Sequence, residues 1–325
     1  MDDNPGDHFL VLSDEALSSL GIPVMEIVDA VENAIRAEAA GKVWTAPKSA
    51  VLPGDGRYMM TTLSTSDEPD MTVVKSVMVS PRNPGRGLPG VEGNIILQDS
   101  ETGRLRACMQ AGWVTAVRTA GLSAVVARKM ANPQSKKIAF IGCGVQARSH
   151  LDAFAELFPL TEIRAFGRGQ ANIDRLCRMA EEKGMGAKAC DTSREALEGA
   201  DLVVSSVTFT FDRQPFIDAR WLPPGAFATI TDIAAPWMAD GMAAFDAVII
   251  DDLEQERVSQ KKMVDPDLVR GDLRTLIAGE ADVVTFDPQK RSAFIFRGLA
   301  IGDFAVASLA YERACADSKG TSVRW

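Results

Sequence analysis

The most informative chemical pattern in the chain is a glycine-spaced turn. Gly142, Gly144 and Ala147 follow the apolar run 138–141 in the order G-x-G-x-x-A. The first glycine of such a turn permits a tight bend, and the second lets backbone N–H groups approach a pyrophosphate. The small third residue lets the next helix pack on the strand, so that the helix N-terminus faces the negative charge. With strand signals before it and strand and helix signals after it, the turn predicts a dinucleotide site. The alternative is a tight turn with no ligand.

The next strand bears on the type of dinucleotide. Residues 162–166 predict this strand, and Gly167 and Arg168 follow it, with no carboxylate at its tip. A carboxylate at that place commonly binds the ribose hydroxyls of NAD. Arg168 could instead contact a 2′-phosphate, which favours NADP(H), or stack on adenine and accept NAD(H), so both cofactors stay open. We expect the remaining cofactor contacts to come from Val145, Gln146, Thr208 and Thr119.

The composition argues against several other classes of function. The chain has 325 residues, of which 46% are hydrophobic and 24% charged, as in a soluble protein of two domains. A net charge of −9 without a cluster of Lys and Arg argues against nucleic-acid binding. No apolar run reaches the ~18 to 20 residues of a membrane span, and the acidic start is unlike a secretory leader. Five cysteines without a CxxC pair indicate reduced thiols in the cytoplasm. Two histidines provide little for a zinc site or a Ser-His-Asp triad, so we expect no metal.

The order of predicted helices and strands differs before and after the glycine turn. Before it lie an apolar helical face from Val24 to Ile35, several short β-like runs, and a turn-rich segment at 99–103 that is typical of a hairpin. Residues 112–131 predict a long helix of mostly small side chains. From residue 136 onwards, strand and helix signals alternate, which is typical of βαβ units in a parallel sheet. We therefore predict an α/β protein with a doubly wound Rossmann sheet and a second α/β domain.

Four segments have distinctive sequences. They read GLPGVEGNIILQDSETGRLRA (87–107), TAVRTAGLSAVVARKMA (115–131), IGCGVQARSHLDA (141–153) and FRGLAIGDFAVASLAYERA (296–314). Together and in this order they resemble the ornithine cyclodeaminase/mu-crystallin family. The resemblance implies a Rossmann domain over residues 131–298 that binds NAD(H) or NADP(H). It also implies a domain over residues 1–130, completed by the C-terminal helix at about 299–325, that binds the substrate and forms a homodimer.

The same resemblance suggests roles for individual cations. Lys75, in the run TVVKSVMV, matches the family's substrate lysine. If its strand is buried, desolvation lowers the pKa of its ammonium, which suits proton donation near neutral pH. Arg118 matches the family arginine, whose guanidinium can bind a carboxylate through two hydrogen bonds. Lys48 lies where the family often has a second carboxylate-binding arginine, and Arg57 is a further candidate cation. The alternative is that these are ordinary solvated charges.

Asp232 marks a departure from the family pattern. The cyclodeaminases carry an aspartate that assists the release of ammonia, and it aligns with Ala234 here. Asp232 lies two residues earlier, and alternate residues of an extended backbone point to the same side. Asp232 could therefore act as a catalytic residue in the same site. The alternative is a structural carboxylate at the end of a strand.

These features predict an enzyme that reduces a 2-imino acid to an L-amino acid with a nicotinamide cofactor, or runs the reverse dehydrogenation. Such a reaction needs a cation for the carboxylate and a group that handles the proton of the nitrogen. Lys48, Arg57 and Arg118 favour a substrate with a second carboxylate, and iminosuccinate giving L-aspartate is our best single choice. Two alternatives stay open. One is ornithine cyclodeaminase, which forms proline and ammonia, and the other is a mu-crystallin-like protein that binds NADP(H) and a small ligand.

Overall fold

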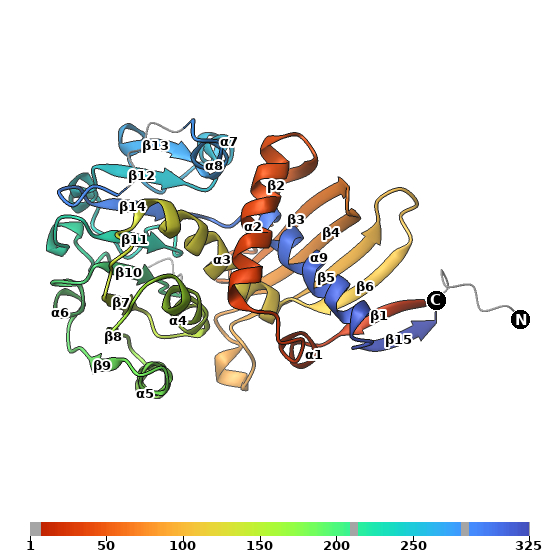
Figure 1. Cartoon of the computed structure of the whole chain (residues 1–325), viewed down its shortest axis with the longest axis horizontal. Helices are drawn as coiled ribbons and strands as arrows, with labels where there is room; N and C mark the ends of the chain where they lie inside the picture. The colour runs from red at the N-terminus through yellow and green to blue at the C-terminus, as the bar shows by residue number, and fades with distance from the viewer. Residues whose placement is uncertain (1–7, 209–213, 281–285, 325) are drawn as a thin grey trace, which may run out of the picture. The chain divides into compact units, whose positions relative to one another are not determined.

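The structure of the protein, a computed structural model, describes residues 8–208, 214–280 and 286–324 (Figure 1). The chain forms two units. The first comprises Met1–Arg118 and Leu299–Trp325, and the second comprises Thr119–Gly298. The division falls inside helix α3 (Gly112–Met130), whereas the sequence placed it near residue 130, at the end of that helix.

The first unit is built on a sheet of seven strands in the order β15-β1-β6-β5-β4-β3-β2. Its pairings are antiparallel except for β1 with β6, which is parallel. The predicted hairpin at 99–103 is confirmed, because it joins two neighbouring antiparallel strands. The strands are β1 (His8–Leu12), β2 (Val43–Val51), β3 (Tyr58–Asp67), β4 (Asp70–Val79), β5 (Val91–Asp99), β6 (Leu105–Gln110) and β15 (Thr321–Arg324).

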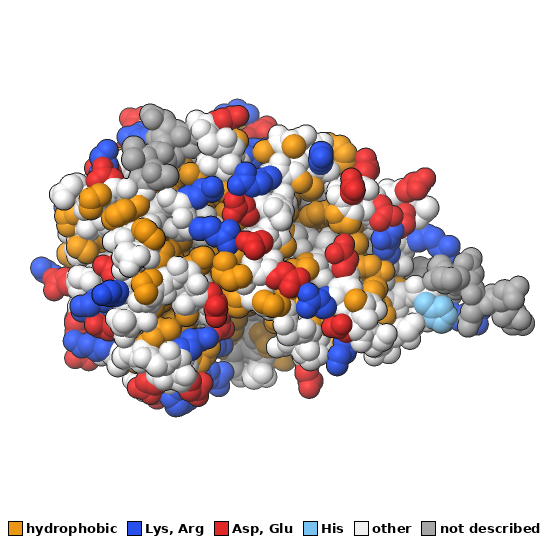
Figure 2. All heavy atoms as spheres, in the orientation of Figure 1, with side chains coloured by type: hydrophobic (Ala, Val, Ile, Leu, Met, Phe, Trp, Pro, Cys, Tyr) orange, Lys and Arg blue, Asp and Glu red, His pale blue; other side chains and the backbone are white. Residues whose placement is uncertain are grey.

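Two long helices, α2 (Val24–Ala39) and α9 (Ala300–Ala316), cover one face of this sheet (Figure 1). The predicted apolar face of α2, including Ile27, Val31 and Ile35, is buried. Helix α9 is apolar almost all round and contacts both α2 and strands β2 to β5, as expected of a core helix. Figure 2 shows acidic and basic side chains interspersed on the solvent side of this region. The first unit also contains α1 (Asp14–Ser18), the 3-10 turn η2 (Pro84–Arg86) and the first residues of α3.

The second unit is built on a sheet of eight strands in the order β13-β12-β14-β11-β10-β7-β8-β9, and all its pairings are parallel. The predicted doubly wound Rossmann sheet is therefore confirmed. From β7 the chain runs outward to β8 and β9, and then crosses to β10 on the other side of β7. The strands are β7 (Lys137–Ile141), β8 (Glu162–Phe166), β9 (Gly186–Ala189), β10 (Leu202–Ser205), β11 (Phe227–Ile230), β12 (Ala247–Ile250), β13 (Val269–Asp272) and β14 (Ser292–Ile295).

Apolar strands explain why this sheet forms. Strands β10 and β11 are buried along their whole length, as expected of a parallel sheet with both faces covered. The reversal of strand order between β7 and β10 creates the switch point at which such sheets bind ligands. The helical segments are the rest of α3, α4 (Val145–Leu157), α5 (Gln170–Glu182), α6 (Ser193–Leu197), α7 (Leu253–Val258), α8 (Leu273–Ala278), η3 (Ala219–Trp221), η4 (Ala239–Ala244) and η5 (Pro266–Leu268). Within the described residues, no helix combines the length and the apolar content needed to cross a membrane.

Candidate functional site

The glycine turn lies where the carboxyl ends of β7, β8 and β10 meet. Gly142 has a φ of +93°, and its N–H donates to the carbonyl oxygen of Phe166 over 2.8 Å. A Cβ on Gly142 would lie 2.6 Å from the carbonyl oxygen of Ser206, closer than atoms can approach. Both the backbone conformation and the close approach therefore require glycine at this position.

The turn leaves space in front of the first turn of α4. Gly144 is the N-cap of this helix, no side chain caps it, and its first turn carries no acidic residue. A Cβ at Gly144 would have no neighbour within 4 Å among the described residues outside its own helix, and Val145 beside it is 53% exposed. The first N–H groups of a helix lack partners within the helix and attract anions. These residues therefore fit a dinucleotide pyrophosphate.

The other predicted cofactor contacts are placed around this turn. Gln146 belongs to the first turn of α4, and Arg168 is exposed two residues after the end of β8. Thr208 is exposed three residues after β10, at the carboxyl end of that strand. Thr119 is buried in α3, at the start of the second unit. Their contacts with a cofactor stay predictions.

The first unit contains a buried cluster of charges, made of Lys75, Arg118 and Asp303. Lys75 Nζ donates to Asp303 Oδ1 over 2.5 Å, and Arg118 Nε lies 3.0 Å from the same oxygen. The other carboxylate oxygen, Oδ2, accepts a hydrogen bond of 3.0 Å from Thr62. Relative exposures of 2%, 8% and 1% show that all three charges have left bulk water. One carboxylate thus faces two cations in the core.

Strand register places Lys75 in this cluster. It lies directly opposite Thr62 on β3, and cross-strand neighbours point to the same face of a sheet. Along β4, Lys75 alternates with partly exposed residues and shares the buried face with Met71, Val73 and Val77. The sequence-based expectation that a buried strand would desolvate this lysine is therefore confirmed. Asp303 enters the same face from α9, which contacts β3 and β4.

Burial controls the protonation of the cluster. It lowers the pKa of Lys75 to about 8, and the charges of Arg118 and Lys48 act in the same direction against the opposing effect of Asp303. Burial alone would raise the pKa of Asp303, but the charges of Lys75 and Arg118 outweigh it and hold that pKa below its usual value. Asp303 is thus an anion at neutral pH, whereas Lys75 can gain or lose a proton at a pH close to neutral.

Arg118 has hydrogen-bond donors to spare. Its Nε and Nη1 are buried and have no hydrogen-bond partner in the part of the chain that the structure describes, although Nε is within ion-pair distance of Asp303. A buried guanidinium N–H without a partner is costly and is normally satisfied by an acceptor. A planar guanidinium suits a carboxylate ligand best. This geometry supports the predicted role of Arg118, which stays a prediction.

The two remaining candidate cations differ in their surroundings. The register of β2 on β3 shifts between Ala46 and Ser49, so that Lys48 lies in a bulge opposite Thr62. Lys48 is half-buried, 6.0 Å from the ring of Tyr58, and near enough to Lys75 to lower its pKa. Arg57 is instead held by Asp55, whose Oδ2 lies 2.8 Å from Arg57 Nε. The structure therefore brings Lys48 to the cluster and leaves Arg57 paired within a turn.

Asp232 lies in the second unit, beyond the carboxyl end of β11. It is 7% exposed, and its Oδ2 accepts hydrogen bonds from Ser205 Oγ over 2.5 Å and from the Val207 N–H over 3.0 Å. Both donors belong to the end of β10 and the loop that follows it. The contacts described for Asp232 are thus with its own unit.

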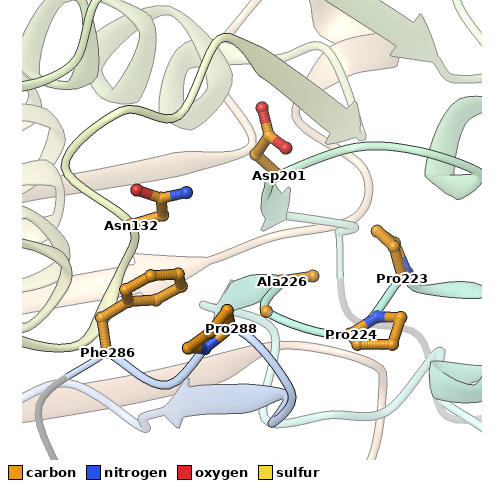
Figure 3. A pocket seen from close by; sticks show the side chains of 8 residues that line it. Asn132, Asp201, Pro223, Pro224, Ala226, Phe286 and Pro288 are labelled. Carbon is orange, nitrogen blue, oxygen red and sulfur yellow. The ribbon is translucent and has the colours of Figure 1, made fainter.

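A small pocket in the second unit lies at the opposite end of the sheet (Figure 3). Phe286 and several prolines line it, together with Asn132 and Asp201. Asp201 Oδ2 accepts hydrogen bonds of 2.8 and 3.0 Å from the N–H groups of Lys136 and Lys137, at the start of β7. The pocket therefore surrounds the amino ends of the strands, whereas ligands of open parallel sheets bind at the carboxyl ends. It is not the reaction site.

Comparison with known proteins agrees with this architecture. The family model described as "Ornithine cyclodeaminase/mu-crystallin family" matches residues 11–318. The chain belongs to this family. Its family resemblance, predicted from the four segments, is thereby confirmed.

Members of the ornithine cyclodeaminase/mu-crystallin family that resemble this chain include dehydrogenases and reductases. An alanine dehydrogenase of Archaeoglobus fulgidus is 30% identical over 97% of this chain and 98% of its own. A Δ(1)-pyrroline-2-carboxylate reductase of Thermococcus litoralis, solved with NADH and L-proline, has a TM-score of 0.89 and 26% identity over 97% of this chain and 100% of its own. An archaeal alanine dehydrogenase dimer with bound NAD has a TM-score of 0.86 and 27% identity over 98% of this chain and 99% of its own.

Sequence reasoning missed one member of the buried cluster. Asp303 lies inside the segment FRGLAIGDFAVASLAYERA, but no role was assigned to it. The available signal was a single aspartate among small and apolar residues in the first turn of a helix that is buried along most of its length. A carboxylate in such a helix is rarely tolerated unless it is paired.

Proposed function

We propose that this protein reduces a 2-imino acid to an L-amino acid with a nicotinamide dinucleotide, and that it also catalyses the reverse dehydrogenation. The buried cluster of Lys75, Arg118 and Asp303 carries this proposal, because it offers a carboxylate anchor beside a group that exchanges protons near neutral pH. The open N-terminus of α4 offers the place for the dinucleotide.

At a coarser level, the chain is an NAD(P)-dependent oxidoreductase, as predicted. The three relatives named above are two alanine dehydrogenases and a Δ(1)-pyrroline-2-carboxylate reductase, and two of the three were solved with NADH or NAD. Both NAD(H) and NADP(H) belong in any assay, since β8 ends in Gly167 and Arg168 without a ribose-binding carboxylate.

Each residue of the cluster has a distinct task in this proposal. The guanidinium of Arg118, whose Nη1 makes no hydrogen bond within the described residues, binds the substrate carboxylate and orients it. Lys75 Nζ gives its proton to the imine nitrogen during reduction, and in its neutral form it takes a proton from the amine during oxidation. Asp303 fixes the position of Lys75 Nζ, and Thr62 in turn holds Asp303. The bound dinucleotide supplies the hydride that the imine carbon receives.

Iminosuccinate is the substrate that we propose first, because Lys48 adds a third cation near Thr62 and Lys75. The pairing of Arg57 with Asp55 argues in the other direction, since it removes one cation that a second carboxylate could use. The imino acid that pyruvate forms with ammonia, whose reduction gives alanine, should therefore be tested beside iminosuccinate. A cyclodeaminase is less well supported, because Ala234 replaces the family's aspartate and Asp232 is held by its own unit.

A substrate screen tests this function. The wild-type chain is mixed with NADH or NADPH, ammonia and, one at a time, oxaloacetate, pyruvate and longer 2-oxo acids, and nicotinamide absorbance is followed. We expect oxidation of the cofactor that requires both ammonia and the oxo acid. A response to pyruvate but not to oxaloacetate would reject the dicarboxylate. In a separate incubation with ornithine and NAD, formation of proline would show a cyclodeaminase. Dinucleotide binding without any turnover would show a binding protein.

We also propose that the protein is a homodimer in the cytoplasm. On the sheet face opposite Lys75, the paired residues Leu63, Val74 and Ile96 form an apolar row that continues to Val11 on β1. Leu63, Ile96 and Val11 are 43%, 40% and 41% exposed in the single chain. A second copy of the chain would cover them, as expected of an exposed apolar patch, and the related archaeal enzyme is a dimer. All five cysteines are free, which suits a reducing compartment.

A further inference from the structure

The turn after β11 has an unusual backbone. Ile233 and Ala234 have φ values of +53° and +56°, and the Ala235 N–H donates to the carbonyl oxygen of Asp232 over 3.1 Å. Two successive positive φ angles under such a hydrogen bond are typical of a type I′ turn, whose central residues are usually Asn and Gly. A β-branched residue in this conformation is strained, and strain of this kind persists only where surrounding contacts impose it.

Contacts on both sides of the turn impose this conformation. Ile233, Ala234 and Trp237 pack in the apolar cluster that fills one side of the second unit. The carbonyl oxygen of Pro236 accepts hydrogen bonds of 2.8 and 3.0 Å from the N–H groups of Phe216 and Ile217. The turn is thus a fixed part of the core.

The fixed turn aims Asp232 at the end of β10. Asp232 Oδ2 accepts from Ser205 Oγ over 2.5 Å and from the Val207 N–H over 3.0 Å. Ser205 Oγ in turn accepts from Trp237 Nε1 over 3.1 Å. Because Asp232 and Trp237 belong to the same loop, the end of β10 is held at two points by the segment that follows β11.

The loop held in this way contacts the glycine turn. Ser206, between the two residues that Asp232 binds, donates from its Oγ to the carbonyl oxygen of Gly142 over 3.2 Å. Its own carbonyl oxygen is the atom that excludes a side chain from Gly142. The contacts therefore run from Asp232 through residues 205–207 to the turn that faces the helix α4 N-terminus.

We infer that Asp232 is a positioning residue of the dinucleotide site, which holds the loop after β10 against the glycine turn. This inference rests on the proposed function, and of the two roles that the sequence left open for Asp232 it favours the structural one over the catalytic one. Asp232 Oδ2 already accepts two hydrogen bonds inside its own unit, and both of them hold the loop after β10 in place.

Two substitutions at Asp232 distinguish a role in positioning the loop after β10 from a role in proton transfer. Asp232→Ala removes the acceptor, and we expect the Kd for NADH and NADPH to rise about tenfold or more. Asp232→Asn keeps an amide oxygen that can accept from both Ser205 and Val207 but carries no exchangeable carboxyl proton. We expect Asp232→Asn to retain most of the dinucleotide affinity and a kcat and pH profile close to those of the wild type.

Asp201→Ala is the matched control. Asp201 also accepts two backbone N–H groups with one oxygen, but at the amino ends of the strands. We expect this variant to lose stability without a change in dinucleotide affinity. Ser205→Ala gives a second, milder variant in case Asp232→Ala fails to fold, and its Kd should rise by a smaller factor.

Direct binding measurements decide between the outcomes. If the wild type binds neither dinucleotide, the proposed function itself fails. If the wild type binds and Asp232→Ala or a folded Ser205→Ala binds equally well, the positioning role is rejected while the proposed function stands. An Asp232→Asn variant that binds like the wild type but loses kcat would likewise reject the positioning role, and would make Asp232 an acid or base.

Discussion

Lys75 Nζ and Asp303 Oδ1 are 2.5 Å apart, although 228 residues separate them in the chain. The contact joins the middle of β4 to α9, so the C-terminal helix supplies a charge to the centre of the first unit. Without Asp303, the buried cations Lys75 and Arg118 would repel each other in a medium that screens charge poorly. The proposed chemistry therefore depends on the packing of α9 as much as on Lys75 itself.

Lys75→Met should abolish turnover and spare dinucleotide binding. The thioether keeps the bulk of the side chain but cannot hold a proton, and loss of a general acid typically costs a factor of about 10² to 10⁴ in rate. The measurements are kcat in the substrate screen and the Kd for NADH and NADPH. Lys188→Met is the control, because Lys188 pairs with Glu195 on the surface of the other unit. A kcat for Lys75→Met equal to that of the wild type would remove Lys75 from the reaction.

The pH dependence of the two directions should be opposite. Reduction requires the protonated form of Lys75, whose pKa is about 8, so kcat/KM for reduction should fall as the pH rises through that value. Oxidation requires the neutral form and should rise over the same range. Profiles measured in both directions check this, and a flat profile in both would contradict it.

The same pKa predicts a change in stability. Burial lowers the pKa of Lys75 from 10.5 to about 8, so between these values the unfolded chain holds a proton that the folded chain has lost. Stability therefore rises with pH across this window, because the unfolded state binds more protons. Denaturant unfolding of the wild type and of Lys75→Met should diverge there; parallel curves would speak against a lowered pKa.

Arg118→Lys should weaken substrate binding. Lysine keeps the charge but loses the planar pair of N–H groups that binds a carboxylate. We expect KM for the oxo acid to rise about 10- to 100-fold, as for the loss of a charged hydrogen bond. Arg57→Lys is the matched control and should change KM little, because Asp55 already binds Arg57. An equal rise in both variants would show that the two arginines share the substrate.

Gly142→Ala should destroy the dinucleotide site. The added methyl would need a φ near +93° and would collide with the carbonyl oxygen of Ser206. We expect dinucleotide binding to fall below detection, with a loss of about 1 to 3 kcal/mol in the free energy of unfolding. Gly54→Ala has a similar φ of +85° but open space around its Cβ, so it isolates backbone strain. Normal binding by Gly142→Ala would place the dinucleotide elsewhere.

Leu63→Glu combined with Ile96→Glu should yield monomers. Leu63 and Ile96 lie on either side of Val74 on the sheet face opposite Lys75. A dimer contact would bury this face, and carboxylates buried there without a partner are costly. Light scattering after size exclusion measures the mass. Val258→Glu, on the exposed surface of α7, is the control and should leave the mass unchanged. A wild type that is monomeric at assay concentrations would rule out the dimer.

The dinucleotide turn and the parallel sheet could be read from the sequence because their signals are local. Gly142, Gly144 and the apolar run before them occupy a few consecutive residues, and strand and helix alternate regularly afterwards. Short strands such as β13, with a glycine near its centre, and β14 gave no comparable signal. Their place in the sheet depends on pairing with β12 and β11.

The charge cluster was predictable only in part. The burial of Lys75 followed from the valines around it, whereas Asp303 could be assigned only through contacts between distant segments. The pairing of Arg57 with Asp55 was missed even though the residues are close in the chain, because spacing alone does not tell a bound arginine from a free one. Asp232 was placed correctly near a strand end, but its partners lie on another strand.

The bulge at Pro47 and Lys48 also has a consequence for solubility. Strand β2 ends the seven-stranded order, so one of its edges has no neighbouring strand within the described part of the chain. A proline and a charged residue at an irregular point interrupt the regular row of groups that a foreign strand would need for annealing. The bulge that places the Lys48 ammonium near the buried cluster would thus also hinder strand pairing between copies of the chain at the edge of β2, and so reduce aggregation.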